Sequence, residues 1–543
     1  MSYEPPRWRD DLPAALIVAC LLLPQSLAYA LLAGLPPVAG VMASTLPLVA
    51  YALLGTSRTL AVGPVAVLAL MTAAAIGPLA QEHGVPALTV ALVIALQMAA
   101  LMGLAALLKL DALASLLSAP VLHGFIGGAA LAIALGQVPK LLGSSLPGSN
   151  AVEWLQALPH AAAPVGMAVL LGGGSLALLL LIRRFAKGTW ARLGPLAVVA
   201  LAIAVVALLP AEQRAGLRLT GVVRLQDGLQ FSPAWSAPAA LWWAALPASS
   251  LMALVAYVEG LAVAQALAAR RGERVQPRRE LLGLAAANAA AGLVGGQPVT
   301  GGLARSGVAF EAGARTRWAG AFTAVAFVLL VALASPVLAL LPQAVLAAVV
   351  ILAVLPLVEP GAFVRAWHYS RSEGALMVAV AVLVLTVGVE LALALGVAAS
   401  VALLLQRTAR PHWAEVGRLP GSEVYRNVKR FEVERLPGVL MLRIDEGLCF
   451  TNARWLQDVL WAETARRPEA KQLVLMMSGV NDIDLSGLEA LRQFAADWRA
   501  QGGQLHLSEL KGPVADRLLA DGLHDWLPGK VFRTQSEAWA ALQ

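Results

Sequence analysis

A series of long apolar stretches fills the chain up to about residue 408 and limits what it can fold into. A helix needs about 20 mostly apolar residues to cross the hydrocarbon core of a bilayer. The chain is 59% hydrophobic and 13% charged, with a mean hydropathy of +0.73, whereas soluble domains are about 45–50% apolar and about a quarter charged. The sequence therefore predicts a protein that crosses the membrane about a dozen times or more.

Fourteen stretches are candidates for membrane segments. They are 12–32, 38–54, 60–76, 87–108, 116–137, 164–182, 194–209, 241–268, 281–294, 299–313, 319–334, 337–358, 373–389 and 391–406. The first follows Arg7 and Arg9 and has no cleavage site after a short apolar core. We therefore interpret it as a retained helix instead of a signal peptide.

The basic residues predict the orientation in the membrane. They concentrate in every second loop, for example at 183–192 and 270–279, and such loops are usually cytoplasmic. The loop that carries Arg214, Arg218 and Arg224 is an exception. We expect a multi-pass protein of the cell inner (plasma) membrane with both termini in the cytoplasm. The net charge of +7 needs no nucleic-acid partner.

Metal, redox and nucleotide chemistry have little support in the sequence. The two cysteines, Cys20 and Cys449, cannot make a disulfide framework or a four-thiolate zinc site. No Walker-type phosphate loop is present. We expect no cofactor, no metal and no enzymatic activity.

The third and tenth stretches are unsuited to continuous helices. The third contains Gly63-Pro64, and the tenth follows Pro298 and contains Gly301 and Gly302. Glycine and proline oppose a continuous helix. Two inverted repeats of seven segments, each with one discontinuous helix at a central site, would place breaks at these matching positions. The alternative is that these are breaks of the kind membrane helices tolerate routinely.

A soluble domain follows the apolar part. From about residue 410 the polar residues return, and strand-length apolar runs at 439–444, 472–477 and 504–508 alternate with helical patterns at 452–465 and 486–501. This alternation predicts a small α/β domain. We place the transport domain at 1–408 and the cytosolic linker and α/β domain at 409–543.

Several long motifs together resemble one family, the SulP anion transporters or sulfate permeases, which are similar to solute carrier 26 proteins and carry a C-terminal STAS domain. The motifs are PQSLAYA at 24–30 with AGLPP at 33–37, GTSR at 55–58 with Gly63-Pro64, PVTGGLARS at 298–306, and MSGVNDIDLSGL at 477–488. The resemblance covers nearly the whole chain. It implies a helical membrane domain of core plus gate, a homodimer, and a STAS domain that binds a cytosolic protein.

The resemblance also implies where an anion binds. In the family the third and tenth segments meet with their N-termini facing across the site, and helix N-termini attract anions through free N–H groups and the helix dipole. The substrate-binding residues implied in this chain are Gln25, Tyr29, Val65, Ala66, Gly302, Leu303, Ala304 and Arg305. Two positions depart from relatives: Ala304 stands where many have serine, and Val65 where animal members have phenylalanine.

Glu259 is an ionisable group inside the eighth stretch. Such groups are costly in a membrane and are functional hypotheses by default. Glu259 and Arg305 match positions that proton-coupled relatives are thought to use, so protonation of Glu259 would free Arg305 to hold the anion. The alternative is a structural ion pair between the two residues.

Two further residues have weaker interpretations. Ser486 matches a serine that is phosphorylated in related anti-sigma-factor antagonists, but an N-cap role is favoured over regulatory phosphorylation. His123 is expected to be a hydrogen-bonded packing residue instead of a ligand.

We expect a secondary transporter of a small inorganic or organic anion, with sulfate–proton symport by alternating access as the first choice. Sodium-coupled bicarbonate transport and proton-coupled dicarboxylate transport are alternatives within the family. A passive anion channel and a sensor that uses the STAS domain are rivals of a different class. A nucleobase carrier is disfavoured because a neutral base needs no fixed cation such as Arg305.

Overall fold

The computed structural model describes residues 8–110, 118–144, 151–157, 159, 165–186, 189–222, 225 and 233–543. It divides into two compact units, Met1–Ser400 and Val401–Gln543. Arg7, Arg224 and the first residues of the predicted stretches at 116 and 164 lie outside the described residues. The predicted boundary after residue 408 stays a prediction.

The first unit is helical, and its last helix, α19, continues past Ser400 into the second unit. Its elements are α1 (Trp8–Leu32), α2 (Pro37–Met42), α3 (Leu46–Leu54), β1 (Val62–Gly63), α4 (Ala66–His83), α5 (Ala87–Leu107), α6 (Ala119–Leu141), α7 (Ala151–Ala157), α8 (Gly166–Phe185), α9 (Thr189–Leu208), α10 (Ala211–Ala215), η3 (Pro233–Ser236), α12 (Ala239–Ala269), α13 (Pro277–Leu293), β2 (Thr300–Gly301), α14 (Leu303–Glu311), α15 (Trp318–Leu338), α16 (Gln343–Val354), η4 (Leu355–Leu357), α17 (Pro360–Tyr369), α18 (Arg371–Thr386) and α19 (Val389–Ala409). Within the described ranges, nine helical spans are long and apolar enough to cross a membrane.

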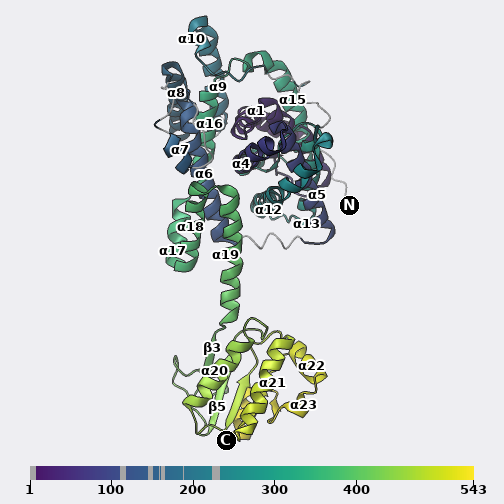
Figure 1. The fold of residues 1–543 in the computed structure, drawn as a ribbon, viewed down its shortest axis with the longest axis vertical. Helices are drawn as coiled ribbons and strands as arrows, with labels where there is room; N and C mark the ends of the chain where they lie inside the picture. The colour runs from purple at the N-terminus through teal and green to yellow at the C-terminus, as the bar shows by residue number, and fades with distance from the viewer. Residues whose placement is uncertain are drawn as a thin grey trace. The chain divides into compact units, whose positions relative to one another are not determined.

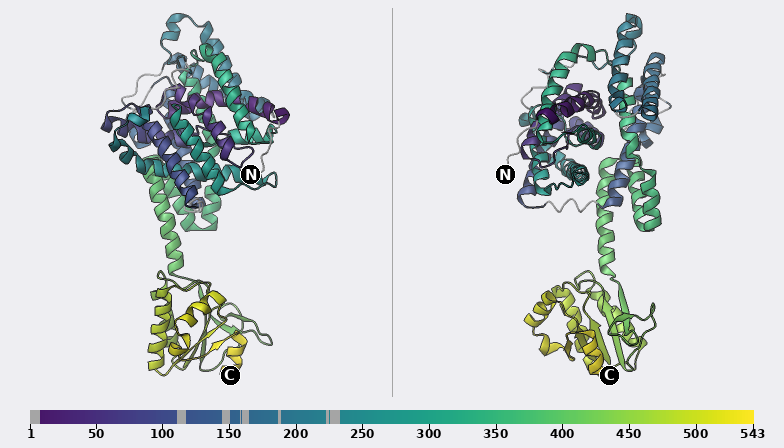
Figure 2. Two further views of the ribbon diagram at one scale, coloured as in Figure 1. Left: turned by 90° about the vertical axis from the view of Figure 1, so that its right-hand side faces the viewer. Right: turned by 180° about the vertical axis from the view of Figure 1, so that it is seen from behind.

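These helices form two bundles. Helices α1 to α5 and α12 to α15 pack together, and α6, α8, α9 and α16 to α19 make the second bundle (Figure 1 and, from behind, Figure 2). α1 and α4 of the first bundle contact α16, α9 and α6 of the second. The two bundles therefore meet along α1 and α4.

Each of the fourteen predicted stretches overlaps a helix of the structure, and the third and tenth are interrupted as predicted. The second stretch is also broken, into α2 and α3, and the twelfth begins only at Gln343. Helix α17 was missed because its ten residues are amphipathic and shorter than a membrane span. The relation between the two halves as inverted repeats stays a prediction.

The buried carboxylate of Glu280 on α13 fixes the loop that leads into the third stretch. It accepts hydrogen bonds from the Tyr51 hydroxyl at 2.5 Å and from the backbone N–H groups of Thr56 and Ser57 at 2.7 and 3.0 Å, and also from the Thr56 hydroxyl. Glu280 is fully buried. A buried carboxylate is tolerated when its oxygens are satisfied in this way.

Asp11 anchors a second loop by the same device. Its Oδ1 accepts from the N–H groups of Arg315 and Thr316 at 2.7 and 3.0 Å, and its Oδ2 accepts from the Thr316 hydroxyl at 2.5 Å. This ties the start of α1 to the loop between α14 and α15. Both loops adjoin an interrupted segment, so the two carboxylates help to position the site.

The second unit is an α/β domain with a six-stranded sheet in the order β4-β3-β5-β6-β7-β8. Its elements are β3 (Trp413–Arg418), β4 (Tyr425–Asn427), β5 (Val439–Ile444), α20 (Ala453–Arg466), β6 (Gln472–Met476), α21 (Leu485–Ala500), β7 (Gln504–Ser508), α22 (Gly512–Ala520), α23 (Leu523–Trp526), β8 (Val531–Phe532) and α24 (Gln535–Leu542). β5 to β8 are parallel and β3 and β4 antiparallel. The strands and helices predicted at 439–508 are confirmed to within one residue at each end.

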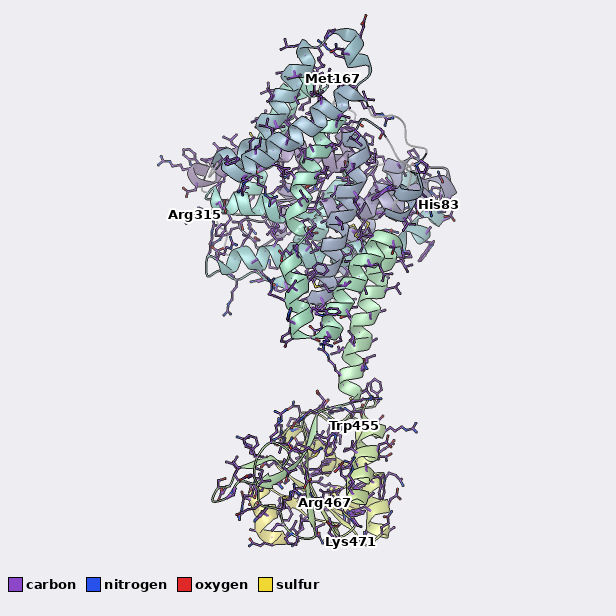
Figure 3. All side chains as sticks on the ribbon, turned by 90° about the vertical axis from the view of Figure 1, so that its left-hand side faces the viewer. His83, Met167, Arg315, Trp455, Arg467 and Lys471 are labelled. Atoms are coloured by element: carbon purple, nitrogen blue, oxygen red, sulfur yellow. The ribbon has the colours of Figure 1, made fainter. Side chains whose placement is uncertain are left out.

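The predicted pattern missed the strands and helices at the two edges of this sheet. β3 has a mixed burial pattern, and its Glu415 pairs at 2.7 Å with Arg467, which Figure 3 labels. β4 and β8 have three and two residues. Such short or charged edge strands give little periodicity to detect.

We predict that Glu280→Ala destabilises the fold by roughly 3 kcal/mol, because four donors lose their acceptor and two of them are buried with it. The measurement is thermal unfolding of the purified protein in detergent. Glu82→Ala, which removes an exposed carboxylate at the end of α4, is the matched control and should unfold like the parent. Equal unfolding of the two variants would contradict the prediction.

We predict that the C-terminal unit loses stability as the pH falls from about 6.5 to about 4. Burial, and then the nearby charge of Lys530, lower the pKa of His506 from 6.5 to about 4, and its Nδ1 accepts a hydrogen bond from the Lys530 N–H. The unfolded chain binds more protons in this range, so folding weakens as the pH drops. Unfolding of a fragment spanning 409–543 at several pH values measures this, and in His506→Gln the pH slope should shrink.

Candidate anion-binding site

The two interrupted segments meet inside the first unit. β1 and β2 pair antiparallel, with Val62 opposite Gly301 and Gly63 opposite Thr300. All four residues are buried. The pairing satisfies backbone groups that lipid could not satisfy, and it brings the starts of α4 and α14 together.

A cavity of about 60 Å³ lies at this meeting point. It is lined by Gln25, Tyr29, Pro64, Val65, Ala66, Val67, Glu259, Gly302, Leu303, Ala304, Arg305, Ala353 and Leu357. All eight residues expected to bind substrate and the expected coupling residue therefore line one cavity. They come from α1, α4, α12 and α14, and α16 with η4 supplies the opposite wall.

Helices α4 and α14 both begin at the cavity, and neither N-terminus has a side-chain cap. Val65 precedes α4 and Gly302 precedes α14, and neither makes a side-chain cap hydrogen bond. The first intrahelical bonds run from Ala69 N to Val65 O at 2.9 Å and from Ser306 N to Gly302 O at 3.0 Å. The N–H groups before these positions have no acceptor within their own helix, so each end offers donors and a positive dipole to an anion.

Arg305 supplies a full positive charge. It is 2% exposed, and within the described part of the chain neither of its Nη atoms has a hydrogen-bond partner. A Cβ added at Gly63 would lie 2.9 Å from Nη1, and one at Gly302 would lie 3.0 Å from Nη2. The guanidinium therefore lies between the backbones of the two interrupted segments. A buried, unpaired cation is unfavourable, and a bound anion would relieve this cost.

Glu259 on α12 lines the same cavity, and its Oε2 is buried without a hydrogen-bond partner. Arg305 is not bonded through either Nη. The direct ion pair considered as the structural alternative is therefore not formed through these atoms. Two opposite charges in one small cavity without a direct bond can still act on each other and on a third charge between them.

Gln25 and Tyr29 lie one turn apart on α1 and line the cavity, as their spacing predicted. They can offer an amide and a hydroxyl to a bound anion. Ala304 and Val65 also line it, so the cavity lacks the hydroxyl and the aromatic ring that relatives have at these positions.

Sequence reasoning missed the residues that position these groups. Asn288 on α13 is fully buried and bonds both the N–H and the C=O of Val299 at 3.0 Å. Ser306 accepts from Ala61 N–H at 2.9 Å, and Thr300 Oγ1 donates to Ala256 O at 2.5 Å. An asparagine inside an apolar stretch is the one signal that the sequence offered.

Two weaker interpretations need correction. The N-cap of α21 is Asp484, whose carboxylate accepts from Gly487 N–H at 2.8 Å, so the favoured N-cap role for Ser486 was wrong. Ser486 instead lies in the first turn, in a groove with Arg454 and Arg492. His123 is hydrogen-bonded as expected, to Ala119 O at 2.8 Å, but its side chain is exposed, so the packing part of the expectation was wrong.

The fold and cavity define a multi-pass membrane protein with a buried cationic site. Comparison with known families finds the Sulfate permease family over residues 8–380 and the STAS domain over 430–538. The chain belongs to the sulfate permease family, whose members transport anions, and it is not an enzyme.

Named relatives agree with this. A probable sulfate transporter of Mycobacterium tuberculosis is 34% identical, with 96% of this chain and 92% of that protein covered. The chloroplastic sulfate transporter 4.1 of Arabidopsis thaliana is 31% identical, with 97% and 79% covered. Among solved structures, the murine Solute Carrier 26 family member A9 anion transporter, in its inward-facing state, shares the fold with a TM-score of 0.87 at 20% identity over 100% of this chain and 92% of that one.

The transmembrane domain of the cyanobacterial bicarbonate transporter BicA has a TM-score of 0.63 at 21% identity. It covers 72% of this chain and 98% of its own. At this identity the likeness shows the fold alone.

We predict that Gly63→Ala lowers anion transport about tenfold while the protein still folds. The new Cβ would lie 2.9 Å from Arg305 Nη1, which is the end of a flexible side chain and must move away from the cavity. Gly77→Ala on α4 is the matched control because a Cβ there meets nothing within 4 Å. Reconstituted flux and thermal unfolding are measured for both, and equal flux would contradict the prediction.

Proposed function

We propose that the protein is a secondary active transporter that carries sulfate together with a proton. The observation that carries the proposal is the small cavity that holds two helix N-termini, the buried Arg305 and the half-buried Glu259, whose Oε2 is buried. Curated relatives at 34% and 31% identity bear the names of sulfate transporters, which supports sulfate as the anion. The residues proposed to bind it are Gln25, Tyr29, Val65, Ala66, Gly302, Leu303, Ala304 and Arg305.

Charge balance explains why a proton would move with the anion. With Glu259 ionised, its negative charge opposes a second anion beside Arg305. Protonation removes that charge, and the guanidinium and the two helix ends then act on the anion alone. Because both groups line one cavity, proton and anion would bind together and leave together.

Transport would proceed by alternating access. The interrupted segments belong to one bundle, and the facing wall comes from α16 and η4 of the other. A movement of the first bundle against the second would open the cavity to one side of the membrane and then to the other. No covalent step or cofactor is needed.

Several further assignments belong to the same proposal. The transport domain would span 1–408 and the linker and STAS domain 409–543, in a homodimer in the inner membrane with both termini in the cytoplasm. The STAS domain would bind a cytosolic protein. Ser486 would be a regulatory phosphorylation site, because a phosphate there would lie at the start of α21 and near Arg454 and Arg492.

A second candidate is sodium-coupled bicarbonate transport, which the fold shared with BicA favours. Proton-coupled dicarboxylate transport stays an alternative, which competition by fumarate tests. A passive channel would pass anions without regard to a proton or sodium gradient.

We predict that sulfate uptake into proteoliposomes is stimulated by an inward proton gradient and that Glu259→Gln abolishes the stimulation. The glutamine is permanently neutral, so sulfate exchange should persist while coupling is lost. Radiolabelled sulfate flux with and without the gradient measures this, with bicarbonate and fumarate as competitors. Glu82→Gln, an exposed carboxylate outside the cavity, is the matched control and should remain coupled.

The outcomes separate the candidates. Sodium-driven bicarbonate flux without sulfate flux in folded protein would replace both substrate and coupling ion. Sulfate flux that no gradient affects, in parent and variant alike, would favour a channel.

A further inference from the structure

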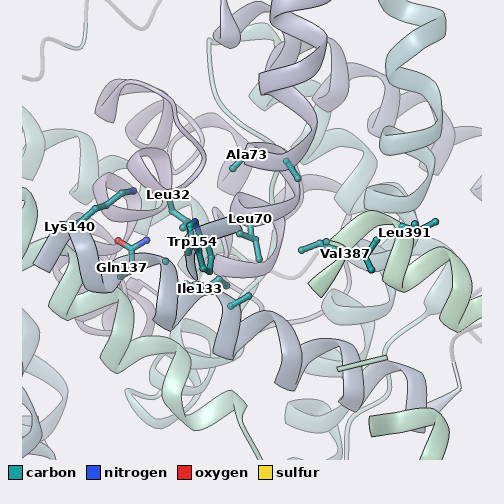
Figure 4. Close-up of a pocket in the computed structure, with 14 residues that line it drawn as sticks. Leu32, Leu70, Ala73, Ile133, Gln137, Lys140, Trp154, Val387 and Leu391 are labelled. Carbon is teal, nitrogen blue, oxygen red and sulfur yellow. The ribbon is translucent and has the colours of Figure 1, made fainter. Parts of the chain in front are cut away.

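A larger cavity of about 380 Å³ lies between the two bundles and is separate from the central cavity (Figure 4). Its lining comes from the C-terminal parts of α1 and α6, from the interior of α4, from α7, and from the start of α19 with the two residues before it. The lining residues are Leu32, Leu70, Ala73, Ala74, Ala132, Ile133, Gly136, Gln137, Lys140, Trp154, Val387, Gly388, Val389 and Leu391. Among the side chains that the structure describes, this lining includes one cation and no carboxylate.

The polar groups of this cavity lie on one face of α6. Ile133, Gly136, Gln137 and Lys140 follow the spacing that puts residues on the same side of a helix. Lys140 Nζ has three donor hydrogens, and its one acceptor among the described residues is Leu31 O at 3.3 Å. The Gln137 residue is only 4% exposed, and its amide bonds no other described residue. Two buried or half-buried groups are thus available to a ligand.

The cavity is about one helical turn from the central site. Tyr29 lines the central cavity and Leu32 the larger one, and on α4 the corresponding residues are Ala66 and Leu70. At a rise of about 1.5 Å per residue these pairs are about 5–6 Å apart along their helices. An ion in the larger cavity therefore needs to pass only one turn of α1 and α4 to reach Arg305.

The side of the membrane follows from α1. Leu32, which lines the cavity, is the last of the 25 residues of α1, and these residues span about 37 Å along the helix axis. The larger cavity therefore lies toward the end of α1 that is opposite the N-terminus. With the cytoplasmic termini of the proposed function, this is the outer side.

A second basic residue lies beside the cavity. Lys140 also lines a neighbouring cavity of about 60 Å³, and Arg218 lines that cavity from another loop. Arg218 is exposed, and no hydrogen bond or ion pair of its side chain is found among the described residues. Arg218 belongs to the basic loop that is an exception to the usual cytoplasmic location of positive charge. Attraction of anions to this side would explain why the loop is basic.

We propose that the larger cavity is an outer binding site for small oxyanions, in which Lys140 and Gln137 hold the ion before it reaches Arg305. Arg218 raises the local anion concentration at its mouth. The Trp154 indole, which packs on Gly136 so closely that a Cβ there would lie 2.8 Å from it, closes one wall. That this site feeds a transport path rests on the proposed function.

The first test is sulfate uptake from the outer side of right-side-out vesicles. Lys140→Gln should raise the KM for external sulfate about three- to tenfold with little change in kcat, because capture weakens and the central site is intact. Lys140→Arg should behave like the parent, since it keeps the charge. Arg184→Gln is the matched control, because it removes an exposed cation of α8 that lines neither cavity. An unchanged KM in Lys140→Gln would overturn the proposal.

The second test does not depend on transport. In a background with Cys20 and Cys449 replaced by alanine, Ala73→Cys places a thiol on the cavity wall (labelled in Figure 4). Rates of modification by an anionic and a cationic methanethiosulfonate reagent are compared. Lys140→Gln should lower the anionic-to-cationic rate ratio about tenfold if Lys140 attracts anions into the cavity.

These two tests distinguish failure of the proposed transport function from failure of the outer-site proposal. Absence of sulfate flux in the folded parent would defeat the proposed function, while a Lys140-dependent rate ratio would still support the anion site. If Lys140 serves only to tie α6 to Leu31 O, Lys140→Gln should lower the melting temperature and leave the rate ratio unchanged. That result would contradict the proposal of an outer anion site, whether or not the parent protein transports sulfate.

Discussion

The structure depends on the need to satisfy backbone polar groups where two segments of the chain stop being helical inside the membrane unit. An exposed N–H or C=O in lipid costs several kcal/mol. Here residues 62–63 and 300–301 satisfy one another as a two-stranded pair, and the helices that follow begin at nearly the same point. The break that costs stability elsewhere in a membrane helix thus creates paired N-termini. In the proposed function, the resulting positive potential attracts an anion without several free cations in lipid.

Polar residues around β1 and β2 hold the neighbouring loops in place through hydrogen bonds. Glu280 holds the loop before β1, Asp11 holds the loop after α14, and Asn288 holds Val299 next to β2. At the other end of α14, Arg271 donates to the carbonyls of Ala314 and Phe310 at 2.6 and 3.1 Å, which suits the negative end of the helix dipole. Each group is buried or half-buried and bonded. The two site charges, Arg305 and Glu259, keep bonding atoms without partners. This contrast marks the cavity as the place where a ligand completes the structure.

The proposed outer site would attract anions by positive charge in the same way as the central cavity. Its one lysine and one amide lie on the face of α6 that meets α1 and α4, the helices that also wall the central site. A single cation in a partly apolar cavity attracts an anion and holds it weakly enough for it to move on. The contact between the two bundles therefore packs them together and also lies on the proposed path of the anion to Arg305.

The sequence by itself determined the class of fold. Apolar stretches of membrane length, the breaks at Gly63-Pro64 and Gly301-Gly302, and the alternating pattern after residue 410 were enough to predict a helical membrane domain and an α/β domain, since these signals are local in the chain. Family motifs then indicated the residues that are proposed to form the site. Only the tertiary structure brought these residues into one cavity, paired β1 with β2, and placed Glu280 against Thr56 and Lys140 against Leu31. Those contacts join residues more than a hundred positions apart, and a single sequence carries no local signal for such long-range packing.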